Sequence, residues 1–418
     1  MLIHSASQLL TLSGGPQRGN TLGDLGIIED GAVLFREGQI IEIGLTRDLR
    51  GSYPDEPTYD AAGHVVMPGF VDPHTHLIWA GNRAAEFEMR LQGKSYLEIL
   101  AAGGGILSTV TSTRSATLEE LTSQTRERLQ NMFRFGTTTA EAKTGYGLER
   151  DTELAMLEAI LALDAEGPLE LVPTYLGAHA IAPEYKDQPD EYTRHLCEEM
   201  IPGVKEWWLG HIPERPLPFV DVFCETGAFT LAQSDRILST ASQLGFPLKI
   251  HADEFDNLGG ASLAAQLGAT SADHLVKTSL RDIQALAHSE TIAVALPCTP
   301  FGLAEPHYTP AREILAANGY LSIASDLNPG TAWCENMQFV IALACRYLRL
   351  TPAQAIAAAT INAAAAIRRA DRIGSIEPGK QADLLILSVD DYRHLGYRFG
   401  TNLVQSVFKK GIFYPVRG

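Results

Sequence analysis

Short apolar runs alternate with longer amphipathic segments through the middle of the chain. Each run has the length and composition of a buried strand, and the segments between the runs have helical periodicity. The runs lie at residues 65–71, 137–143, 169–177, 219–224, 247–251, 270–274, 291–296 and 321–325. This alternation is typical of parallel βα units, and eight such units predict a (β/α)8 barrel of the α/β class. The active site of such a barrel lies at the C-terminal ends of its strands.

Signals for helix ends support this alternation. Thr117 and Glu120 have the spacing of a capping box at the start of a helix. Thr309-Pro310 and Thr351-Pro352 each have the form of an N-cap residue followed by proline at the first helical position. We therefore expect helices to begin at these three places.

Both ends of the chain carry shorter segments in which apolar and polar residues alternate. Within residues 31–43, Glu37-Gly38 separates two such segments in the way a β-hairpin turn does. Residues 376–387 and 403–414 have the same character and also contain glycine turns. We expect both termini to build one small composite β-sandwich domain. The predicted division is residues 1–64 and 373–418 for this domain and 65–372 for the barrel.

Composition and charge narrow the classes of function. The chain has 418 residues, of which 45% are hydrophobic and 20% charged, as in a folded globular protein. Its formal net charge of −17 would repel nucleic acid and anionic membranes, so an anionic substrate needs a local positive group. The N-terminus lacks the pattern of an export signal, and no apolar run approaches the roughly 18 residues of a membrane span. We therefore expect a cytoplasmic protein.

The cysteines favour a reducing compartment. They form no C-x-x-C pair and no regular spacing, which argues against a cysteine-ligated zinc and favours packing roles. The five are Cys197, Cys224, Cys298, Cys334 and Cys345.

Polar residues gather where the predicted barrel strands end. His74 and His76 follow the first strand and, with the two-residue period of extended chain, point the same way. The later strand ends carry Lys143, His179, Glu225, His251, Glu254, His274 and Asp326. Because these ends share one rim, the side chains should converge there. Three imidazoles and one carboxylate, from His74, His76, His251 and Asp326, would hold one divalent metal and leave a position for water.

Several of these motifs resemble one known superfamily. PGFVDPHTHL, KIHADE, SADHL and SDLNPG are similar to the strand-end motifs of the amidohydrolase superfamily, in the same order. Within that superfamily, longer stretches resemble the imidazolonepropionase family of histidine degradation. They are WAGNRAAEFEMRLQGKSYLEILAAGGGI, TTTAEAKTGYGLE, YLGAHAIAPEY, KIHADEF and SDLNPGT, so the resemblance extends from about residue 65 to 335 and more loosely to the ends.

The resemblance implies roles for particular residues. His74, His76, His251 and Asp326 would bind one zinc or iron ion per chain. The stretch VDVFCETGAF after strand four has no lysine of the kind that bridges two metals in other superfamily members, so a mononuclear site is expected. Substrate would be bound by Arg83, Tyr96, Tyr146, His179, Glu254, Asn328, Gly330 and Thr331. The resemblance also implies a homodimer.

The implied reaction is hydrolysis of the cyclic amide of 4-imidazolone-5-propanoate to N-formimidoyl-L-glutamate. Arg83 is the candidate for the propionate, because the chain is acidic overall and a guanidinium can grip a carboxylate with two hydrogen bonds. Glu254, His274 and Asp326 are the candidates for proton transfer. His274 is the preferred base because imidazole titrates near neutral pH, and Glu254 would carry a proton to the leaving nitrogen.

Two other functions stay open on the sequence. A deaminase of the same superfamily uses a similar His-x-x-Glu, His and Asp arrangement, and a non-catalytic scaffold could be built on the same barrel. Arg83 and the SDLNPGT segment disfavour the deaminase, and the complete ligand set disfavours the scaffold. The roles of Lys143 and Glu225 are left open. Gly103 to Gly105 are expected to form a flexible loop near the mouth of the site.

Overall fold

The central part of the chain forms an eight-stranded parallel sheet rolled into a barrel. The computed structural model describes residues 1–94, 98 and 104–416, so Tyr96 and Gly103 lie outside the described residues. Each strand pairs with the next one along the chain, which confirms the predicted (β/α)8 fold. The strands are β6 (Phe70–Asp72), β7 (Thr137–Lys143), β8 (Glu170–Ala178), β9 (Phe219–Cys224), β10 (Lys249–Ala252), β11 (Ser271–His274), β12 (Ile292–Ala295) and β13 (Leu321–Ile323).

The first and last barrel strands meet just beyond their C-terminal ends. The backbone N–H of His76 donates to the carbonyl of Leu327 over 2.8 Å, and that of Asp326 donates to the carbonyl of His74 over 3.1 Å. Below this seam the buried carboxylate of Asp72 accepts hydrogen bonds from the Ser325 backbone N–H at 3.1 Å and hydroxyl at 2.5 Å. Closing the barrel therefore brings together residues that lie about 250 positions apart in the sequence.

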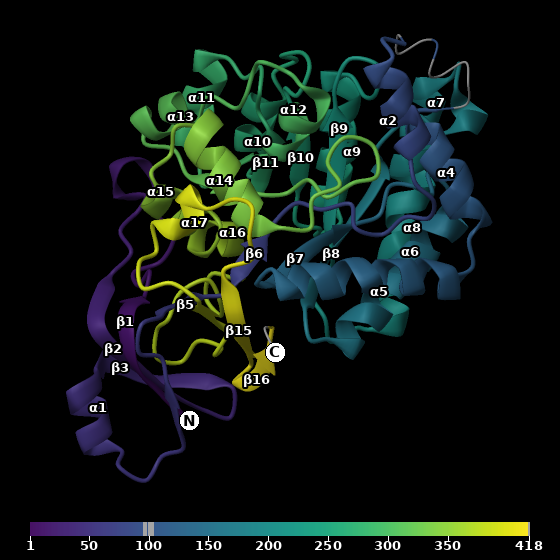
Figure 1. Ribbon diagram of the computed structural model, residues 1–418. Coiled ribbons are helices and arrows are strands. Elements are labelled where there is room, and N and C mark those ends of the chain that lie inside the picture. Colours follow the sequence, from purple (N-terminus) through teal and green to yellow (C-terminus); the bar gives the residue numbers. More distant parts are fainter. Residues whose placement is uncertain (95–97, 99–103, 417–418) are drawn as a thin grey trace.

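Helices surround the barrel strands, as Figure 1 shows. They are α2 (Ala84–Leu91), α4 (Ile106–Ser115), α5 (Leu118–Arg134), α6 (Arg150–Glu166), α7 (Pro189–His195), α8 (Ile201–His211), α9 (Leu231–Gln243), α10 (Gly260–Leu267), α11 (Leu280–Ala287), α12 (Cys298–Leu303), α13 (Ala311–Ala316), α14 (Met337–Tyr347), α15 (Pro352–Ala358) and α16 (Ile361–Ala365). The short turns η2 (Pro183–Tyr185) and η3 (Leu196–Met200) lie between β8 and α8. None of the helices in the described ranges is long and apolar enough to cross a membrane.

Two of the three predicted helix starts are confirmed. Thr117 caps α5 in a capping box with Glu120, and Thr351 caps α15 in the same way. The prediction at Thr309 is wrong by one position, since α13 begins at Ala311. The Thr309 hydroxyl instead donates to the backbone carbonyl of His274 over 2.6 Å, so a tertiary hydrogen bond replaces the local cap.

Strands from both termini form one separate sheet, as predicted. Its order is β16-β15-β14-β5-β1-β2-β3, with β4 paired to β1. Figure 1 shows the purple N-terminal and yellow C-terminal strands lying together below the barrel. The elements are β1 (Leu2–Leu10), η1 (Gly19–Thr21), β2 (Ile27–Arg36), β3 (Gln39–Leu45), α1 (Thr46–Ser52), β4 (Thr58–Asp60), β5 (Val65–Pro68), β14 (Leu384–Leu387), α17 (His394–Tyr397), β15 (Val404–Lys409) and β16 (Ile412–Pro415).

The terminal sheet curls around its own apolar core. Phe35 of β2 and Phe408 of β15 are far apart in the strand order, yet their ring centroids lie 5.5 Å apart in an edge-on contact. Tyr59 of β4 also packs against Phe408, with the two ring centroids 5.6 Å apart. The two hairpin turns also meet, because the N–H of Ala382 donates to the carbonyl of Gly38 over 2.8 Å. Opposite parts of one sheet therefore face each other across the core, as the layers of a sandwich do.

The strand predicted over residues 65–71 is divided between the two sheets. β5 pairs with β1 and β14 of the terminal sheet, whereas β6 opens the barrel beside β7. The chain crosses over at Gly69, where an added Cβ would lie 2.3 Å from the Thr138 hydroxyl oxygen. A side chain at this position would collide with Thr138, and the Pro68-Gly69 pair that interrupts the apolar run is the sequence signal of the crossing. The division of the chain at residues 64/65 and 372/373 stays a prediction.

A buried ion pair joins the terminal sheet to the barrel. The carboxylate of Glu170, on β8, lies 2.6 Å from the Lys409 ammonium on β15, which also meets Asp383 at 2.7 Å. Burial alone would raise the pKa of Glu170, but Lys409 and the hydrogen bond from Gln381 outweigh it and lower the pKa to about 2. The carboxylate therefore favours the folded state wherever it is ionised.

Glu170→Gln should destabilise the fold by about 2 kcal/mol at pH 7 and by much less near pH 3. A folded pKa below the unfolded value contributes stability that is complete above the unfolded pKa and is lost as pH falls toward about 2. Urea unfolding of wild type and variant at both pH values measures this. Glu290→Gln, at a carboxylate whose side chain is 85% exposed, is the matched control with little expected effect. A deficit for Glu170→Gln that is equal at pH 7 and pH 3 would contradict the assignment.

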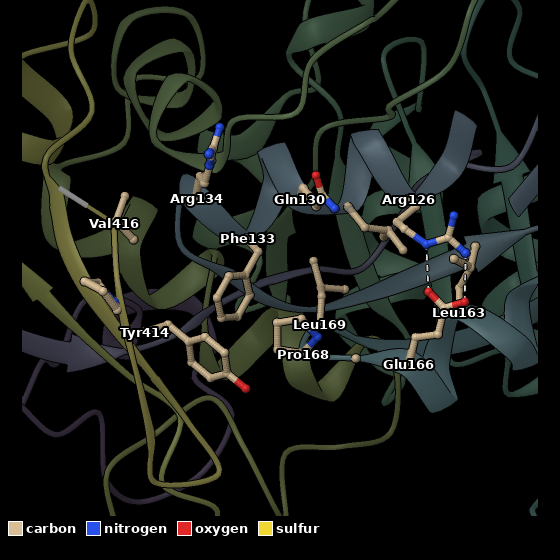
Figure 2. A pocket seen from close by; sticks show the side chains of 13 residues that line it. Arg126, Gln130, Phe133, Arg134, Leu163, Glu166, Pro168, Leu169, Tyr414 and Val416 are labelled. Atoms are coloured by element: carbon tan, nitrogen blue, oxygen red, sulfur yellow. Dashed lines mark hydrogen bonds and ion pairs between the residues drawn. The ribbon is translucent and has the colours of Figure 1, made fainter. Parts of the chain in front are cut away.

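A cavity of about 350 Å³ lies at the opposite end of the barrel from the strand ends that carry the histidines. Figure 2 shows Phe133, Leu169 and Tyr414 on its walls and the Arg126–Glu166 ion pair at its edge. It contains none of the predicted site residues. This end of a barrel contributes to stability, whereas the active site lies at the C-terminal ends of the strands.

Candidate active site

The predicted metal ligands converge at the C-terminal ends of the barrel strands. His74 and His76 follow β6, His251 lies in β10 and Asp326 follows β13. The Nε2 atoms of His74 and His76 lie 3.4 and 3.5 Å from Oδ1 of Asp326. His251 Nε2 lies 3.2 Å from His76 Nε2. Four side chains from three strands therefore lie in one cluster of ligand atoms around His74 and His76.

Burial sets the protonation of this cluster. All four side chains are at most 4% exposed. Burial, and then the neighbouring positive groups, hold the pKa of His74 and of His76 well below its ordinary value. Burial raises the pKa of Asp326 to about 6, against hydrogen bonds that lower it. Neutral imidazoles are the form that binds a metal.

Unsatisfied ring nitrogens indicate a metal more directly. Nε2 of His74 is buried and has no hydrogen-bond partner among the described residues. The facing Nε2 atoms of His76 and His251 can both be satisfied only by sharing a proton or a cation. Three groups of side chains in the described residues have ligand atoms within 4.8 Å of one another, and all three include His74: His74, His76 and Asp326; His74, His251 and His274; and His74, Glu141 and Asp273. The donor set fits one divalent ion of borderline softness.

A layer of buried charge lies directly beneath the histidines. The side chains of Lys143, Lys249, Glu141, Asp221 and Asp273 are all 0% exposed. Lys143 Nζ lies 2.6 Å from Asp221 and 2.9 Å from Glu141, and Lys249 Nζ lies 3.0 Å from Glu141. Burial would lower the pKa of Lys143, but Asp221, Glu141 and Asp273 outweigh it and raise this pKa. The lysine is therefore a fixed cation, which gives it the structural role that the sequence left open.

The same layer orients the imidazole of His74. Asp273 Oδ2 is hydrogen-bonded to Nδ1 of His74 at 2.6 Å, whereas Asp221 Oδ2 lies 3.1 Å from Nδ1 of His251 in an ion-pair contact without hydrogen-bonding geometry. A carboxylate hydrogen-bonded at Nδ1 keeps the proton on that nitrogen, so the lone pair of Nε2 points to the other side. The His74 ring therefore offers Nε2 to the centre of the cluster.

His274 and Glu254 lie beside the cluster. His274 ends β11 with φ of +76°, and its Nδ1 lies 3.6 Å from Oε2 of Glu254. Burial first, and then the nearby His251 and Lys143, keep the pKa of His274 well below its ordinary value. Burial, with Asp326 and Glu225 nearby, raises the pKa of Glu254 well above its ordinary value. The pair thus combines a neutral imidazole with a carboxyl group that can hold a proton at neutral pH.

Glu225 holds the loop that carries Glu254. Its buried carboxylate accepts hydrogen bonds from the backbone N–H groups of Phe255 at 2.9 Å and Asp256 at 3.1 Å. It also accepts from the N–H of Thr226 at 2.8 Å. Glu225 therefore fixes the backbone directly after Glu254, a role that the sequence had left open.

His179 and Tyr146 form a second wall of the site. The ring of His179 stacks on His76 with centroids 4.7 Å apart, and Tyr146 lies 5.3 Å from His179. His179 Nδ1 lies 3.0 Å from the carbonyl of Gly145, and burial lowers its pKa to about 3. The ring is therefore neutral at ordinary pH, with a hydrogen-bonding nitrogen available on its other edge. The buried carboxylate of Glu153 fixes the preceding loop by accepting from the N–H of Gly145 at 3.1 Å.

Arg83 lies beside the loop that follows β13, where it is held by a carboxylate. Its Nε lies 2.9 Å from Glu86 Oε2, and a second contact joins Nη2 to Oε1 of the same side chain. Its remaining Nη1 faces Gly330, where an added Cβ would lie only 2.3 Å away. Arg83 is thus oriented by Glu86, and Gly330 leaves room for the guanidinium.

Asn328 shapes the loop that carries Gly330 and Thr331. Its side-chain carbonyl accepts from the backbone N–H groups of Gly330 and Thr331, each at 2.8 Å. Its amide donates to the backbone carbonyl of Asp326 at 2.7 Å. All three predicted product-side residues therefore lie in one loop fixed to the ligand Asp326. Tyr96 is outside the described residues, and of the predicted glycine loop only Gly104 and Gly105 are described.

Sequence reasoning missed the residues beneath and beside the ligands. Thr299, at the start of α12, donates a hydrogen bond to Oδ2 of Asp326. The charged layer left a signal, because Glu141 precedes Lys143, and Lys249 precedes His251, by two positions in buried strands. That spacing places each pair on the same face of its strand. Asp221 likewise interrupts the otherwise apolar strand β9, and Asp273 lies in the fully buried strand β11.

Comparisons with known proteins agree with this architecture. The amidohydrolase family profile matches residues 65–413. The chain therefore belongs to the amidohydrolase family. Imidazolonepropionase of Herpetosiphon aurantiacus is 51% identical over 98% of this chain and 96% of its own length. Imidazolonepropionase of Chloroflexus aggregans is 48% identical over 98% of this chain and 97% of its own length. Within the family, the chain thus groups with the imidazolonepropionases.

Solved structures share the fold at low sequence identity. A triazine hydrolase variant has a TM-score of 0.74 with 15% identity, covering 99% of this chain and 94% of its own. The 5-methylcytosine deaminase of Klebsiella pneumoniae has a TM-score of 0.71 with 17% identity, covering 100% and 98%. These similarities concern the fold alone.

Glu225→Gln should lower kcat by roughly tenfold while KM stays within about threefold and metal content is unchanged. The amide turns one acceptor into a donor opposite backbone N–H groups, and charge-assisted hydrogen bonds of this kind contribute about 1.5–3 kcal/mol. Steady-state kinetics with elemental analysis measures both quantities. Glu214→Gln, at an exposed position, is the control. A kcat within twofold of wild type would show that the loop does not depend on Glu225.

Proposed function

We propose that this protein hydrolyses the cyclic amide of 4-imidazolone-5-propanoate to N-formimidoyl-L-glutamate. The observation that carries the proposal is the identity of 43–51% with imidazolonepropionases along nearly the whole chain. In the reaction, water adds to the ring carbonyl carbon and the bond from that carbon to the ring nitrogen breaks. One proton of water goes to the departing nitrogen, and the other is released to solvent as the carbonyl carbon becomes a carboxylate.

We further propose that the metal cofactor is one zinc or iron ion held by His74, His76, His251 and Asp326. The orphaned Nε2 of His74 and the facing nitrogens of His76 and His251 support this assignment. When bound, such an ion lowers the pKa of water from 15.7 toward about 7 and polarises a carbonyl group. Elemental analysis of the purified protein decides both the identity and the count.

The residues around the ligands supply binding. Arg83 is proposed to take the propionate, with its guanidinium oriented by Glu86. His179 and Tyr146 are proposed to contact the imidazolone ring, together with Glu254 and Tyr96. The loop of Asn328, Gly330 and Thr331 is proposed to line the product.

Proton transfer is assigned to His274 and Glu254, with Asp326 as a further candidate for the base. The neutral imidazole of His274 is proposed to accept a proton from the attacking water. Glu254, whose raised pKa favours its protonated form, is proposed to deliver a proton to the departing nitrogen. The two groups lie 3.6 Å apart, beyond hydrogen-bonding distance, so direct proton transfer between them would require them to move closer during the reaction.

The alternatives are less well supported. Deaminases share the fold at 15–21% identity, which carries no substrate information. A non-catalytic scaffold has no need of a buried, correctly oriented ligand set beside an acid–base pair. Incubating the purified protein with freshly generated 4-imidazolone-5-propanoate tests the proposal. Loss of the ring absorbance with formation of N-formimidoyl-L-glutamate is expected, and an unchanged substrate would refute it.

A homodimer in the cytoplasm is also proposed, as the resemblance to this family implies. Sedimentation equilibrium of the purified chain tests the oligomeric state. A mass near 45.3 kDa would be that of the monomer and would contradict the dimer.

Arg83→Ala should lower kcat/KM by roughly ten- to a hundredfold, because a charge-assisted hydrogen bond contributes about 1.5–3 kcal/mol. Arg83→Lys should recover only part of the loss, since an ammonium cannot keep both contacts to Glu86 and also present a donor where Nη1 lies. Steady-state kinetics on 4-imidazolone-5-propanoate measures the effect. The assignment is wrong if Arg83→Ala stays within about twofold of wild type.

His274→Asn and Glu254→Gln should each lower kcat by at least two orders of magnitude without loss of metal, since positioned acid–base groups contribute about 10² to 10⁴ in rate. The acidic limb of the kcat/KM profile should also disappear or move in metal-replete His274→Asn, because protonating the base removes activity. An unchanged limb would transfer the base role to Glu254 or Asp326.

A further inference from the structure

A second cavity opens beside the acid–base pair. It has a volume of about 180 Å³ and lies between the loops that follow β10, β11 and β12. Its inner wall includes Glu254, the proposed acid, and Thr299, which hydrogen-bonds Asp326. Its outer wall includes Phe255, Lys277, Glu305 and His307. The cavity thus leads from the reacting centre toward solvent along a route that Arg83 does not line.

Lys277 combines a fixed backbone with a free head group. Its backbone N–H donates to the carbonyl of Asp253 over 2.7 Å, and the next residue, Thr278, donates to the Asp253 carboxylate over 2.8 Å. Within the described part of the chain, no carboxylate lies within 4 Å of its ammonium group. Most other lysines in the barrel are bound to carboxylates or backbone carbonyls, as Lys143, Lys205 and Lys249 are. Lys277 thus contributes a positive charge to the lining of the cavity.

The chemistry of ring opening calls for such a charge. The substrate has one carboxylate, whereas the product has two, because the former ring carbonyl carbon becomes a carboxylate. This second carboxylate forms beside Glu254, in a chain whose formal charge is −17. Arg83 is assigned to the propionate and the proposed metal ion lies where the new carboxylate forms, so a further positive group on the way to solvent would favour the movement of this carboxylate away from the ion.

We propose that this cavity is a second carboxylate subsite, in which the Lys277 ammonium pairs with the carboxylate that ring opening creates. Arg83 keeps the propionate, so the two ends of the dicarboxylate product are held by different residues. The assignment rests on the proposed function, since that reaction defines where the second carboxylate forms. Lys277 is a binding residue in this proposal and takes no part in proton transfer.

Two stable product analogues distinguish how much each of the two carboxylates contributes to binding. N-formyl-L-glutamate has both of them, whereas 4-formamidobutanoate lacks the one that ring opening would create. Calorimetric titration of both compounds into the metal-loaded protein gives their Kd values. Wild type should bind N-formyl-L-glutamate more tightly. Lys277→Met should raise the Kd of N-formyl-L-glutamate by roughly three- to tenfold, the range for a partly exposed ion pair. The Kd of 4-formamidobutanoate should stay within about twofold of the wild-type value.

Matched variants complete the test. Lys277→Arg should restore most of the affinity for N-formyl-L-glutamate, and Lys186→Met, at an exposed lysine elsewhere on the rim, should bind both analogues as wild type does. Arg83→Ala should weaken the binding of both analogues, because both keep the propionate arm.

Three results would overturn the subsite. The first is an equal loss of affinity for both analogues in Lys277→Met, which would report only long-range attraction. The second is an unchanged affinity for both analogues in that variant. The third is a wild-type protein that does not prefer N-formyl-L-glutamate. Failure of wild type to consume 4-imidazolone-5-propanoate would count against the proposed function, and it would leave a selective loss in Lys277→Met as evidence for the carboxylate subsite.

Discussion

The site depends on the pairing of charges that have no access to water. Lys143 and Lys249 share Glu141, while Lys143 also binds Asp221 and lies 3.8 Å from Asp273. Removing any one partner would leave an uncompensated buried charge, which costs several kcal/mol. A buried network of this kind is a weak source of stability, because desolvation offsets much of the attraction. Its contribution here is geometric, since Asp273 holds the imidazole of His74 by a hydrogen bond and Asp221 lies against that of His251.

The loops above the strands are held by a recurring device. A buried side-chain oxygen accepts hydrogen bonds from successive backbone N–H groups, as Glu153 does below Tyr146, Glu225 beside Glu254 and Asn328 after Asp326. Each acceptor replaces the water that an irregular loop would otherwise need. Residues that would touch the substrate therefore sit on loops whose backbone is fixed by the scaffold.

Much of the barrel could be predicted from the sequence, since buried parallel strands are continuous apolar runs separated by helices with clear end signals. Gly69 divides one such run between two sheets, and hydrophobicity alone cannot distinguish a strand that changes sheets. Thr309 has a good capping pattern, yet its hydroxyl bonds to His274 instead, because tertiary contacts outweigh local preference.

The site was predictable where strand ends carry ligands, because topology brings those ends together. The structure places His74, His76, His251 and Asp326 at one point, and their metal-binding role stays a proposal. Lys143 and Glu225 were recognised as polar residues at strand ends, but their partners lie on other strands and loops, so no local pattern reveals their roles. Thr299 bonds to Asp326 from 27 positions away and left no signal at all.

The central claim is that the buried carboxylates fix the imidazoles that hold the metal. The most direct test is the zinc affinity of Asp273→Asn, measured by competition with a chromophoric chelator, with the circular dichroism spectrum as a check on folding. Loss of the carboxylate at Nδ1 of His74 should weaken metal binding by about 10- to 100-fold. Asp371→Asn, at an exposed position, should retain the wild-type affinity. A folded Asp273→Asn variant that binds zinc as tightly as wild type would contradict the claim.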